Sequence, residues 1–377
     1  GESKEPEIIQ YVAEARFWRA FSYDKLYHLF GTVPLVTGSQ DIKNGIARAS
    51  QEEMESFIET ELADVEKVLP ETYSSTDYGR PTSWAVKATL ARYYLNKKDW
   101  KKASIYAKEI IDKGGFNLVD YQDIFSKNQN DEVILAINHI AEANHGNKYV
   151  ALVLEASIRD ALGITGVSAS NGYGMAVPFF RTFDPDDKRI TPYNPATGKG
   201  IAVSGIVYKS DGTPVYGTPE EPKSVEEQLS RILTFKWEVQ TNIPLGEDAS
   251  LNVPALRLGE VMLTYAEAEN ELGHLEEAKT YVDKIRSRAG LENLPANLNM
   301  ASMRDAILDE RGWELYHEGY RREDLVRHGK LLEKVNEKYH YYFGKDMPWK
   351  NNNDRILQPI PTNALLLNPL LKQNPGY

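Results

Sequence analysis

The chain of 377 residues contains no cysteine. Without thiols it can form no disulfide, no thiolate metal site and no cysteine nucleophile. Long apolar runs are also missing, because the longest candidates, such as Val133 to Ile137, fall far short of the roughly 18 to 20 residues that a membrane-spanning helix needs. The sequence therefore predicts no spanning helix.

Positive charge is in short supply. The chain has 44 Lys and Arg against 55 Asp and Glu, a net charge of −11. Nucleic-acid binding needs clustered basic residues that displace counterions, so this balance argues against a nucleic-acid partner. It also disfavours direct binding to an anionic membrane surface.

Catalytic motifs are scarce: there is no G-x-S-x-G, no P-loop and no H-E-x-x-H. The run 184–187 is acidic, but Arg189 stands where a calcium loop needs glycine. Glu-x-x-His, the unit of di-iron bundles, occurs at Glu271/His274, Glu314/His317 and Glu337/His340. The first pair crosses a turn and the last falls on a predicted loop, so convergence is not expected. We predict no catalytic residue, metal or cofactor, with a loose surface calcium site as the alternative.

Helices are predicted for most of the chain. Residues 7–30 form the first, with eight positions expected to face inward: Ile8, Val12, Ala15, Phe17, Ala20, Tyr23, Leu26 and Tyr27. Ser50 and Glu53 form a capping box that opens a helix over 51–69.

Two helical hairpins follow, at 82–95 with 100–113 and at 255–268 with 275–285. Laid over each other at an offset of 175 residues, five positions coincide: Thr89/Thr264, Ala91/Ala266, Ala103/Ala278, Tyr106/Tyr281 and Ile110/Ile285. Repeated hairpins of this kind resemble the tetratricopeptide unit, whose copies stack because none can bury its apolar face alone. The predicted fold is mainly all-α, an α-α superhelix of stacked tetratricopeptide-like helix pairs.

Between residues 163 and 222 the composition changes, with nine glycines and seven prolines. The turn at Asp211-Gly212 predicts a short hairpin. Alternation over 233–239 predicts a half-buried strand with Trp237 inward. We therefore expect one domain over 1–377, with a first helical part at 7–140, a loop and short-strand insertion at 163–250, and a C-terminal part at 251–377. A second aromatic loop spans 339–355.

A row of glutamates marks the third predicted helix of the C-terminal part. Glu310, Glu314 and Glu318 are four apart and would share one face, where like charges repel unless cations lie opposite. Nearby cations are Arg311, Arg321, Arg322 and Arg327. We predict a structural ion-pair network of Glu310, Arg311, Glu314, Glu318, Arg321, Asp324 and Arg327. A catalytic or metal-binding carboxylate row is the alternative.

Four motifs resemble the SusD/RagB family. They are R-L-x-E-V-x-L-x-Y-A-E-A at 257–268, E-R-x-x-E-L-x-x-E-G-x-R-x-x-D-L-x-R at 310–327, the A-E-A-R-F run at 13–17 followed by G-T-V-P-L-V at 31–36, and the tail at 359–377. They occur in family order across nearly the whole chain. The resemblance implies a non-catalytic, cell-surface protein of the outer membrane that binds a glycan and passes it to a SusC-like TonB-dependent transporter.

Family members are typically held in the outer membrane by a lipidated N-terminal cysteine, with a further helical segment before the motif that begins here at Ala13. Neither is present, so the chain resembles a family member without its N-terminal portion, and membrane contact is expected only through that anchor. RagB-like members are associated with peptides, which is the alternative ligand. Two other classes stay open: a glycosidase on a helical scaffold, and a repeat-type scaffold for a protein ligand alone.

A sugar binder needs aromatic faces for pyranose rings and planar polar groups for hydroxyls. The insertion and the 339–355 loop offer both. The predicted ligand-binding residues are Tyr173, Arg181, Tyr193, Asn194, Tyr208, Tyr216, Trp349 and Asn352.

Overall fold

The computed structural model describes residues 5–38, 44–142, 144–154, 156–161, 168–170, 172–190, 207–208, 214–216, 234–240 and 249–377. Helices dominate these residues, as the sequence predicted, and the strands are short. None of the helices in this part of the chain is long and apolar enough to span a bilayer.

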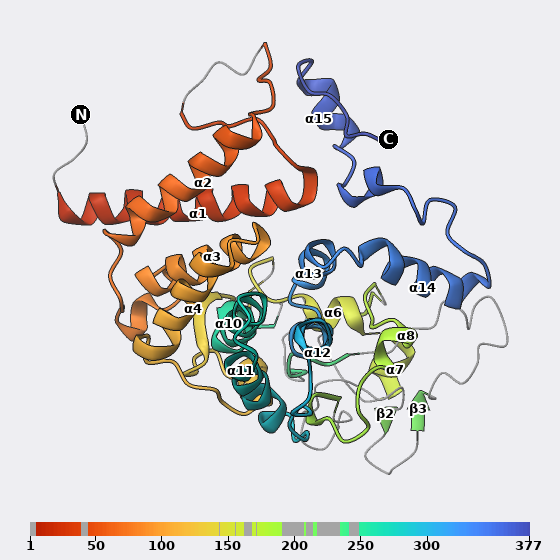
Figure 1. Ribbon diagram of the computed structural model, residues 1–377. Helices are drawn as coiled ribbons and strands as arrows, with labels where there is room; N and C mark the ends of the chain where they lie inside the picture. The colour runs from red at the N-terminus through yellow and green to blue at the C-terminus, as the bar shows by residue number, and fades with distance from the viewer. Residues whose placement is uncertain are drawn as a thin grey trace.

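The N-terminal helices pack in order along the chain (Figure 1). They are α1 (Pro6–Phe30), α2 (Gln51–Glu66), α3 (Ser83–Asn96) and α4 (Trp100–Lys113). The predicted capping box opens α2, where the Ser50 hydroxyl accepts from the Glu53 amide and the Glu53 carboxylate accepts from the Ser50 amide. The helix ends at Glu66 rather than residue 69.

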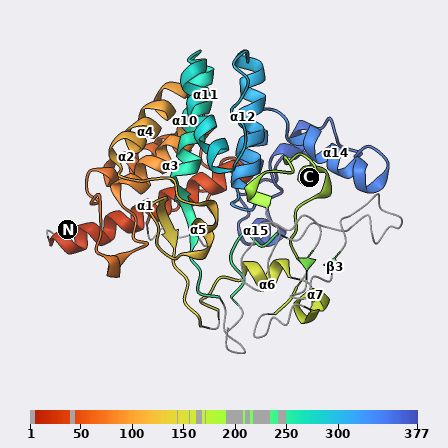
Figure 2. The same cartoon turned by 90° about the horizontal axis from the view of Figure 1, so that it is seen from below.

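The C-terminal helices continue the stack. They are α10 (Leu258–Glu271), α11 (Leu275–Arg288), α12 (Met300–Leu315), α13 (Arg321–Arg327) and α14 (Leu331–Phe343). Helix α10 packs against α4 from the first hairpin and against α12 on its other side. Figure 2 shows α10, α11 and α12 side by side.

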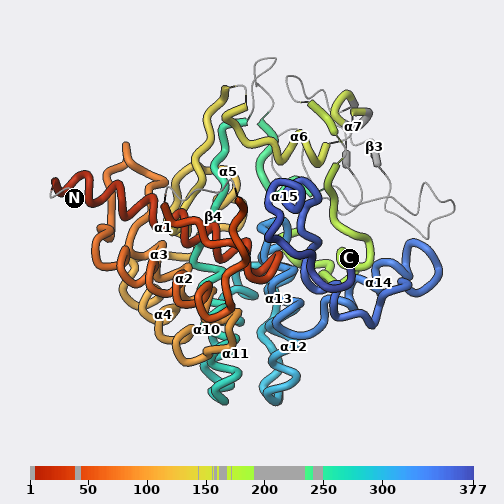
Figure 3. The backbone as a smooth tube through the Cα atoms, turned by 90° about the horizontal axis from the view of Figure 1, so that it is seen from above, coloured from red at the N-terminus to blue at the C-terminus, as the bar shows by residue number. Residues whose placement is uncertain are grey.

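The remaining elements are short. They are η1 (Ser75–Asp77), α5 (Tyr121–Ser126), β1 (Val133–Ile137), α6 (Tyr149–Val153), α7 (Ala156–Ala161), α8 (Val177–Phe180), η2 (Lys188–Ile190), β2 (Val207–Tyr208), β3 (Pro214–Tyr216), β4 (Val253–Arg257), η3 (Asn353–Ile356) and α15 (Thr362–Leu367). Seen from above, α15 and the C-terminus lie over the side of the molecule that carries α13 and α14 (Figure 3). The strands β2 and β3 pair antiparallel, as the predicted short hairpin requires, and the residues 211–212 of the predicted turn lie outside the described residues.

The repeat at an offset of 175 residues extends beyond the five matched side chains. Helices α3 and α10 begin and end at equivalent residues, and so do α4 and α11. The turns inside the hairpins match too, because Lys98 (φ 61°) and Gly273 (φ 88°) both adopt the left-handed conformation. So do Gly115 (φ 74°) and Gly290 (φ 80°), just after the second helices. The two hairpins are therefore copies in backbone as well as in sequence.

The start of α10 corrects one prediction. Ala255 and Leu256 belong to β4, not to the helix, because β4 pairs antiparallel with β1 in the register Leu135 to Leu256 and Val133 to Arg257. The apolar spacing of these residues fits either structure, and the partner strand lies more than 100 residues away. The pairing places the side chain of Arg257 in the interior.

The inward face of α1 was also predicted in part wrongly. Its buried residues are Ala13, Phe17, Ala20 and Asp24. Four residues predicted to face inward are exposed: Ile8, Val12, Ala15 and Leu26. Apolar residues occur on most sides of α1, so their periodicity alone did not show which side of the helix packs on α2.

Segment 234–240 is buried but forms no strand. Phe235, Trp237 and Val239 are inside, as alternation predicted, and contribute to a second apolar cluster with α5 and α6. Thr234 and Lys236 are buried as well, so the prediction of a strand with one polar face was wrong. Burial on all sides follows from the packing of this segment between α5 and the turn after α12, which supplies polar partners for Lys236.

Helix α12 is shorter than the sequence predicted. It ends at Leu315, and His317 (φ 60°) and Gly319 (φ 89°) turn the chain before α13 begins. Glu318 therefore lies in the turn and not on the helical face that carries Glu310 and Glu314. The turn still directs its carboxylate to the same interior cluster.

Candidate functional site

Glu314 lies at the centre of a buried ion cluster. Its carboxylate accepts hydrogen bonds from Arg257 Nη1 at 2.6 Å, from Arg189 Nη1 at 3.1 Å and from Arg288 Nη2. Arg257 also reaches Glu132 at 2.8 Å and Glu318 at 2.7 Å. These side chains come from η2, β4, α11, α12, the residue before β1 and the turn after α12, so the cluster joins the second hairpin and α12 to the insertion.

The partners of the glutamate row differ from the prediction. Glu310 pairs with Arg189 at 2.6 Å and with Arg286 at 3.2 Å, and Glu318 pairs with Lys236 at 2.6 Å. The nearby arginines that we expected as partners do not pair with these glutamates, and two of them, Arg311 and Arg327, pair with other carboxylates. Sequence proximity misled because α12 turns its glutamates toward β4 and α11, away from α13.

Arg311 and Arg327 form a second buried cluster. Arg311 Nε lies 3.0 Å from Asp324, and Arg327 lies 2.6 Å from Glu267 and 2.9 Å from Asp324. Because carboxylates surrounded by cations are stabilised in the charged form, the pKa of Glu267 is far below its usual range although burial alone would raise it. This cluster ties α10 to α13.

Electrostatics in the Glu314 cluster fit a structural role. Burial would raise the pKa of Glu314, but Arg288, Arg257 and Arg189 hold it far below its usual range. Burial lowers the pKa of Lys236 to about 8, although the ammonium donates to Tyr316 O at 2.6 Å and lies 4.2 Å from the centre of the Tyr316 ring. With its charges matched and closed to solvent, the cluster offers no open position to a ligand.

One residue of the acidic run 184–187, Asp187, belongs to the same cluster. Asp187 accepts from Arg189 Nη2 at 2.8 Å, and both side chains are buried. Within the part of the chain that the structure describes, no group of three or more His, Asp or Glu side chains is placed to hold a metal ion.

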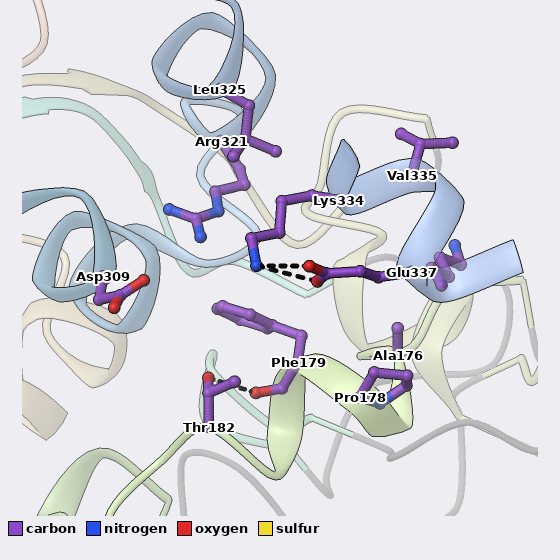
Figure 4. Close-up of a pocket in the computed structure, with 11 residues that line it drawn as sticks. Ala176, Pro178, Phe179, Thr182, Asp309, Arg321, Leu325, Lys334, Val335 and Glu337 are labelled. Carbon is purple, nitrogen blue, oxygen red and sulfur yellow. Dashed lines mark hydrogen bonds and ion pairs between the residues drawn. The ribbon is translucent and has the colours of Figure 1, made fainter. Parts of the chain in front are cut away.

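A solvent-open cavity of about 240 Å³ lies between α8, α12, α13 and α14 (Figure 4). Its apolar wall is formed by Phe179, Pro178, Leu325 and Val335. Short α8 is held beside α14 by a hydrogen bond from the Val177 amide to the Tyr342 hydroxyl at 3.2 Å. Two segments far apart in sequence thus form one concave surface.

Asp309 and Arg321 face this cavity from α12 and α13. Asp309 makes no hydrogen bond or ion pair with any described residue. Desolvation by the surrounding protein raises the pKa of its carboxyl group. The guanidinium of Arg321 lies 5.5 Å from the centre of the Phe179 ring and donates to Leu308 O at 2.6 Å. Arg321 was predicted to belong to the ion-pair network, and the structure places it here instead.

Lys334, Glu337 and Lys338 complete the wall from α14. Lys334 Nζ donates to both Glu337 oxygens, at 2.9 and 3.0 Å, as Figure 4 shows. Lys338 makes no ion pair with a described residue. The cavity thus combines an aromatic ring, an unpaired carboxylate and several donors, a mixture suited to a polar ring-shaped ligand.

A second hollow, of about 760 Å³, lies beside the same helix, between α13, α14 and the segment 350–356. Leu331, Leu332 and Ile356 form its apolar part. The amides of Asn351 and Asn353 line it, and their side chains make no hydrogen bond with any described residue. Free amides beside an apolar floor are again chemistry that suits sugar hydroxyls.

Of the predicted binding residues, the structure describes Tyr173, Arg181, Trp349 and Asn352, and none of them lines either hollow. Tyr173 is 59% exposed and Trp349 38% exposed. The Arg181 guanidinium lies 5.5 Å from the centre of the Tyr341 ring on α14. Asn352 accepts from the Asp354 amide at 3.0 Å as the cap of η3, so its oxygen already has a structural role.

The structure does not describe the side chains of four predicted binding residues. Tyr193 and Asn194 lie outside the described residues, and the side chains of Tyr208 on β2 and Tyr216 on β3 do as well. Phe179 and Asp309, which line the first hollow, and the neighbours of Asn352, which line the second, were not predicted as binding residues. The adjacent aromatics at 179–180 were a usable signal, but nothing local marked Asp309 as unpaired.

Stacked helix pairs with a loop-rich insertion define a helical-repeat scaffold of the tetratricopeptide type. Residues 202–377 match the model of the SusD family, and residues 2–95 match a model described as starch-binding associating with outer membrane. The chain belongs to the SusD/RagB family, as the motifs at 257–268 and 310–327 predicted.

Relatives match over nearly the full chain. SusD-like protein P2 of Formosa agariphila is 29% identical over 401 residues, which cover 99% of this chain and 75% of the relative. The starch-binding protein SusD of Bacteroides thetaiotaomicron is 24% identical, with 98% of this chain and 73% of the relative covered. The solved structure of surface glycan-binding protein A from Bacteroides uniformis has the same fold, with a TM-score of 0.76 at 24% identity, covering 99% and 79% of the two chains.

Proposed function

We propose that this protein binds a glycan without hydrolysing it, at the outer-membrane surface, and delivers it to a SusC-like TonB-dependent transporter. The observation that carries the proposal is the match of 98% of the chain to a starch-binding protein. The description of the second family model supports the outer-membrane location. A lipid anchor is part of the proposal, since it would keep the binding surface beside the transporter.

The two hollows beside α14 support glycan binding on physical grounds. Each joins an apolar floor to polar groups, and Asp309 in the first hollow and Asn351 and Asn353 in the second make no side-chain hydrogen bond with a described residue. Aromatic faces contribute on the order of 1 kcal/mol per stacked ring, so a glycan needs several such contacts along its length. The exposed ring of Trp349, next in sequence to Lys350 at the second hollow, can extend the contact surface.

The test is a calorimetric titration of the protein with a panel of plant and host oligosaccharides and with short peptides. Saturable binding of one glycan class is expected. Trp349→Ala should weaken it, whereas Tyr11→Ala, a truncation of an exposed ring on α1, should not. Binding of peptides alone would overturn the glycan proposal in favour of RagB-like peptide capture.

One observation favours a second candidate, glycoside hydrolysis. The cavity holds two carboxyl groups, Asp309 with its raised pKa and Glu337, and hydrolases use such a pair as acid and nucleophile or base. Glu337 is, however, paired with Lys334. Incubating the purified protein for hours with any glycan it binds separates the two functions. Released sugar that disappears in Asp309→Asn would establish the hydrolase.

A further inference from the structure

We propose that the cavity lined by Phe179, Asp309 and Arg321 is a subsite for one pyranose ring. This inference rests on the proposed glycan binding and adds to it the place and the kind of sugar unit. None of the predicted binding residues lines this cavity, so it is a site additional to them.

The size of the cavity sets the size of the ligand. Its volume of about 240 Å³ is below the roughly 300 to 1,000 Å³ of pockets that enclose drug-sized molecules, so it suits a single ring. The opening lets neighbouring sugar units of a longer glycan remain outside. A terminal or branch residue of the glycan fits this arrangement best.

The wall chemistry favours a sugar ring. Phe179, Pro178, Leu325 and Val335 together supply an apolar surface for the C–H groups of a pyranose. The guanidinium of Arg321 lies beside this surface, 5.5 Å from the centre of the Phe179 ring. The Asp309 carboxylate has no partner among the described residues and can accept from two adjacent hydroxyl groups. Arg321 has donors beyond the one that binds Leu308 O.

The charged groups of the cavity suit the hydroxyl groups of a sugar. Asp309, Glu337, Arg321, Lys334 and Lys338 line it, and Glu337 balances Lys334. The Asp309 carboxylate can accept while Arg321 and Lys338 can donate, so a pair of hydroxyl groups meets an acceptor and donors at once.

Gly312 positions Arg321 for this role. A Cβ atom at Gly312 would lie 2.8 Å from Arg321 Nη1 and 2.9 Å from Cζ, so only glycine lets the guanidinium rest against α12. Gly312→Ala therefore has to displace the guanidinium from its place beside Phe179. Gly312 does not touch the ligand but affects its binding through the position of Arg321.

The experiment titrates the best glycan from the panel into four proteins. Asp309→Asn should weaken binding about tenfold or more, as loss of a charged acceptor does. Asp305→Asn is the matched control one turn earlier on α12, where Asp305 pairs with Lys330 outside the cavity and should leave affinity unchanged. Gly312→Ala should weaken binding by several-fold, and thermal melting checks that each variant is folded.

Unchanged affinity in folded Asp309→Asn would overturn the subsite while leaving glycan binding by the protein intact. Absence of binding to every glycan by the unaltered protein would overturn the proposed function and the subsite with it.

Discussion

Glu314→Gln tests the physical basis of the fold most directly, because it removes one charge and almost no volume. Within the described residues, the cluster around Glu314 joins five cations, Arg189, Lys236, Arg257, Arg286 and Arg288, to five carboxylates, Glu132, Asp187, Glu310, Glu314 and Glu318. The variant leaves one buried positive charge without compensation.

The expected cost follows from burial. Removing one partner of a buried ion pair destabilises proteins by about 3–5 kcal/mol. Three guanidinium groups lose a carboxylate oxygen here, but Arg257 and Arg288 keep Glu132 and Arg189 keeps Glu310. We therefore expect a loss within that range, measured as the change in unfolding free energy by urea titration at pH 7.

A control and the pH dependence make the test sharper. Glu276→Gln, at an exposed position on α11 with no ion pair among the described residues, should stay within about 0.5 kcal/mol. The folded pKa of Glu314 lies below its unfolded value, so its stabilisation is present above about pH 4.5 and is lost as pH falls toward the folded pKa. The difference between protein and variant should therefore shrink between pH 5 and pH 3.

A stability change under 1 kcal/mol at pH 7 would refute this reasoning. So would a large loss of glycan affinity in Glu314→Gln at an unchanged melting temperature, because it would place Glu314 in the binding site.

Two further predictions concern the hairpin turns and the buried lysine. Lys98→Gly should stabilise the protein by up to about 1 kcal/mol and Gly273→Ala should destabilise it by about 1–2 kcal/mol, because both residues adopt the left-handed conformation. A Cβ at Gly273 meets no atom within 4 Å, so backbone strain is the cause tested. Destabilisation by Lys98→Gly or stabilisation by Gly273→Ala in thermal unfolding would contradict the shared turn. Between pH 8 and 10.5 the unfolded chain holds a proton on Lys236 that the folded chain has lost, so this residue makes stability rise with pH in that window. The stability of the protein relative to Lys236→Met should increase across the window in urea titrations, and a flat difference would exclude the lowered pKa.

The buried network shows where prediction from the sequence stops. Glu310 and Glu314 were identified as members of a structural network from their spacing on one helix. Their partners Arg189 and Arg257 could not be found, because they are more than 50 residues from Glu310 and Glu314 in the sequence and reach them only through the packing of η2 and β4. Spacing reports a shared face, not what covers that face.

The candidate site shows the same limit more strongly. The sequence pointed to aromatic and amide residues in two loops, and the hollows lie beside one of those loops. Phe179, Asp309 and Arg321 come from three separate elements, and their proximity depends on α8 packing against α14. No local pattern distinguishes the unpaired Asp309 from the paired Glu310 next to it.

The sequence by itself determined the helix pairs, their repeat at 175 residues, the capping box at Ser50 and the family, because these depend on local periodicity, turn residues and motif order. The tertiary structure decided the strand at 253–257, the buried position of Lys236, the partners of the glutamates and the cavity beside α14. Each of these depends on contacts between residues far apart in the chain, whose energy arises only when the packed elements exclude water from between them.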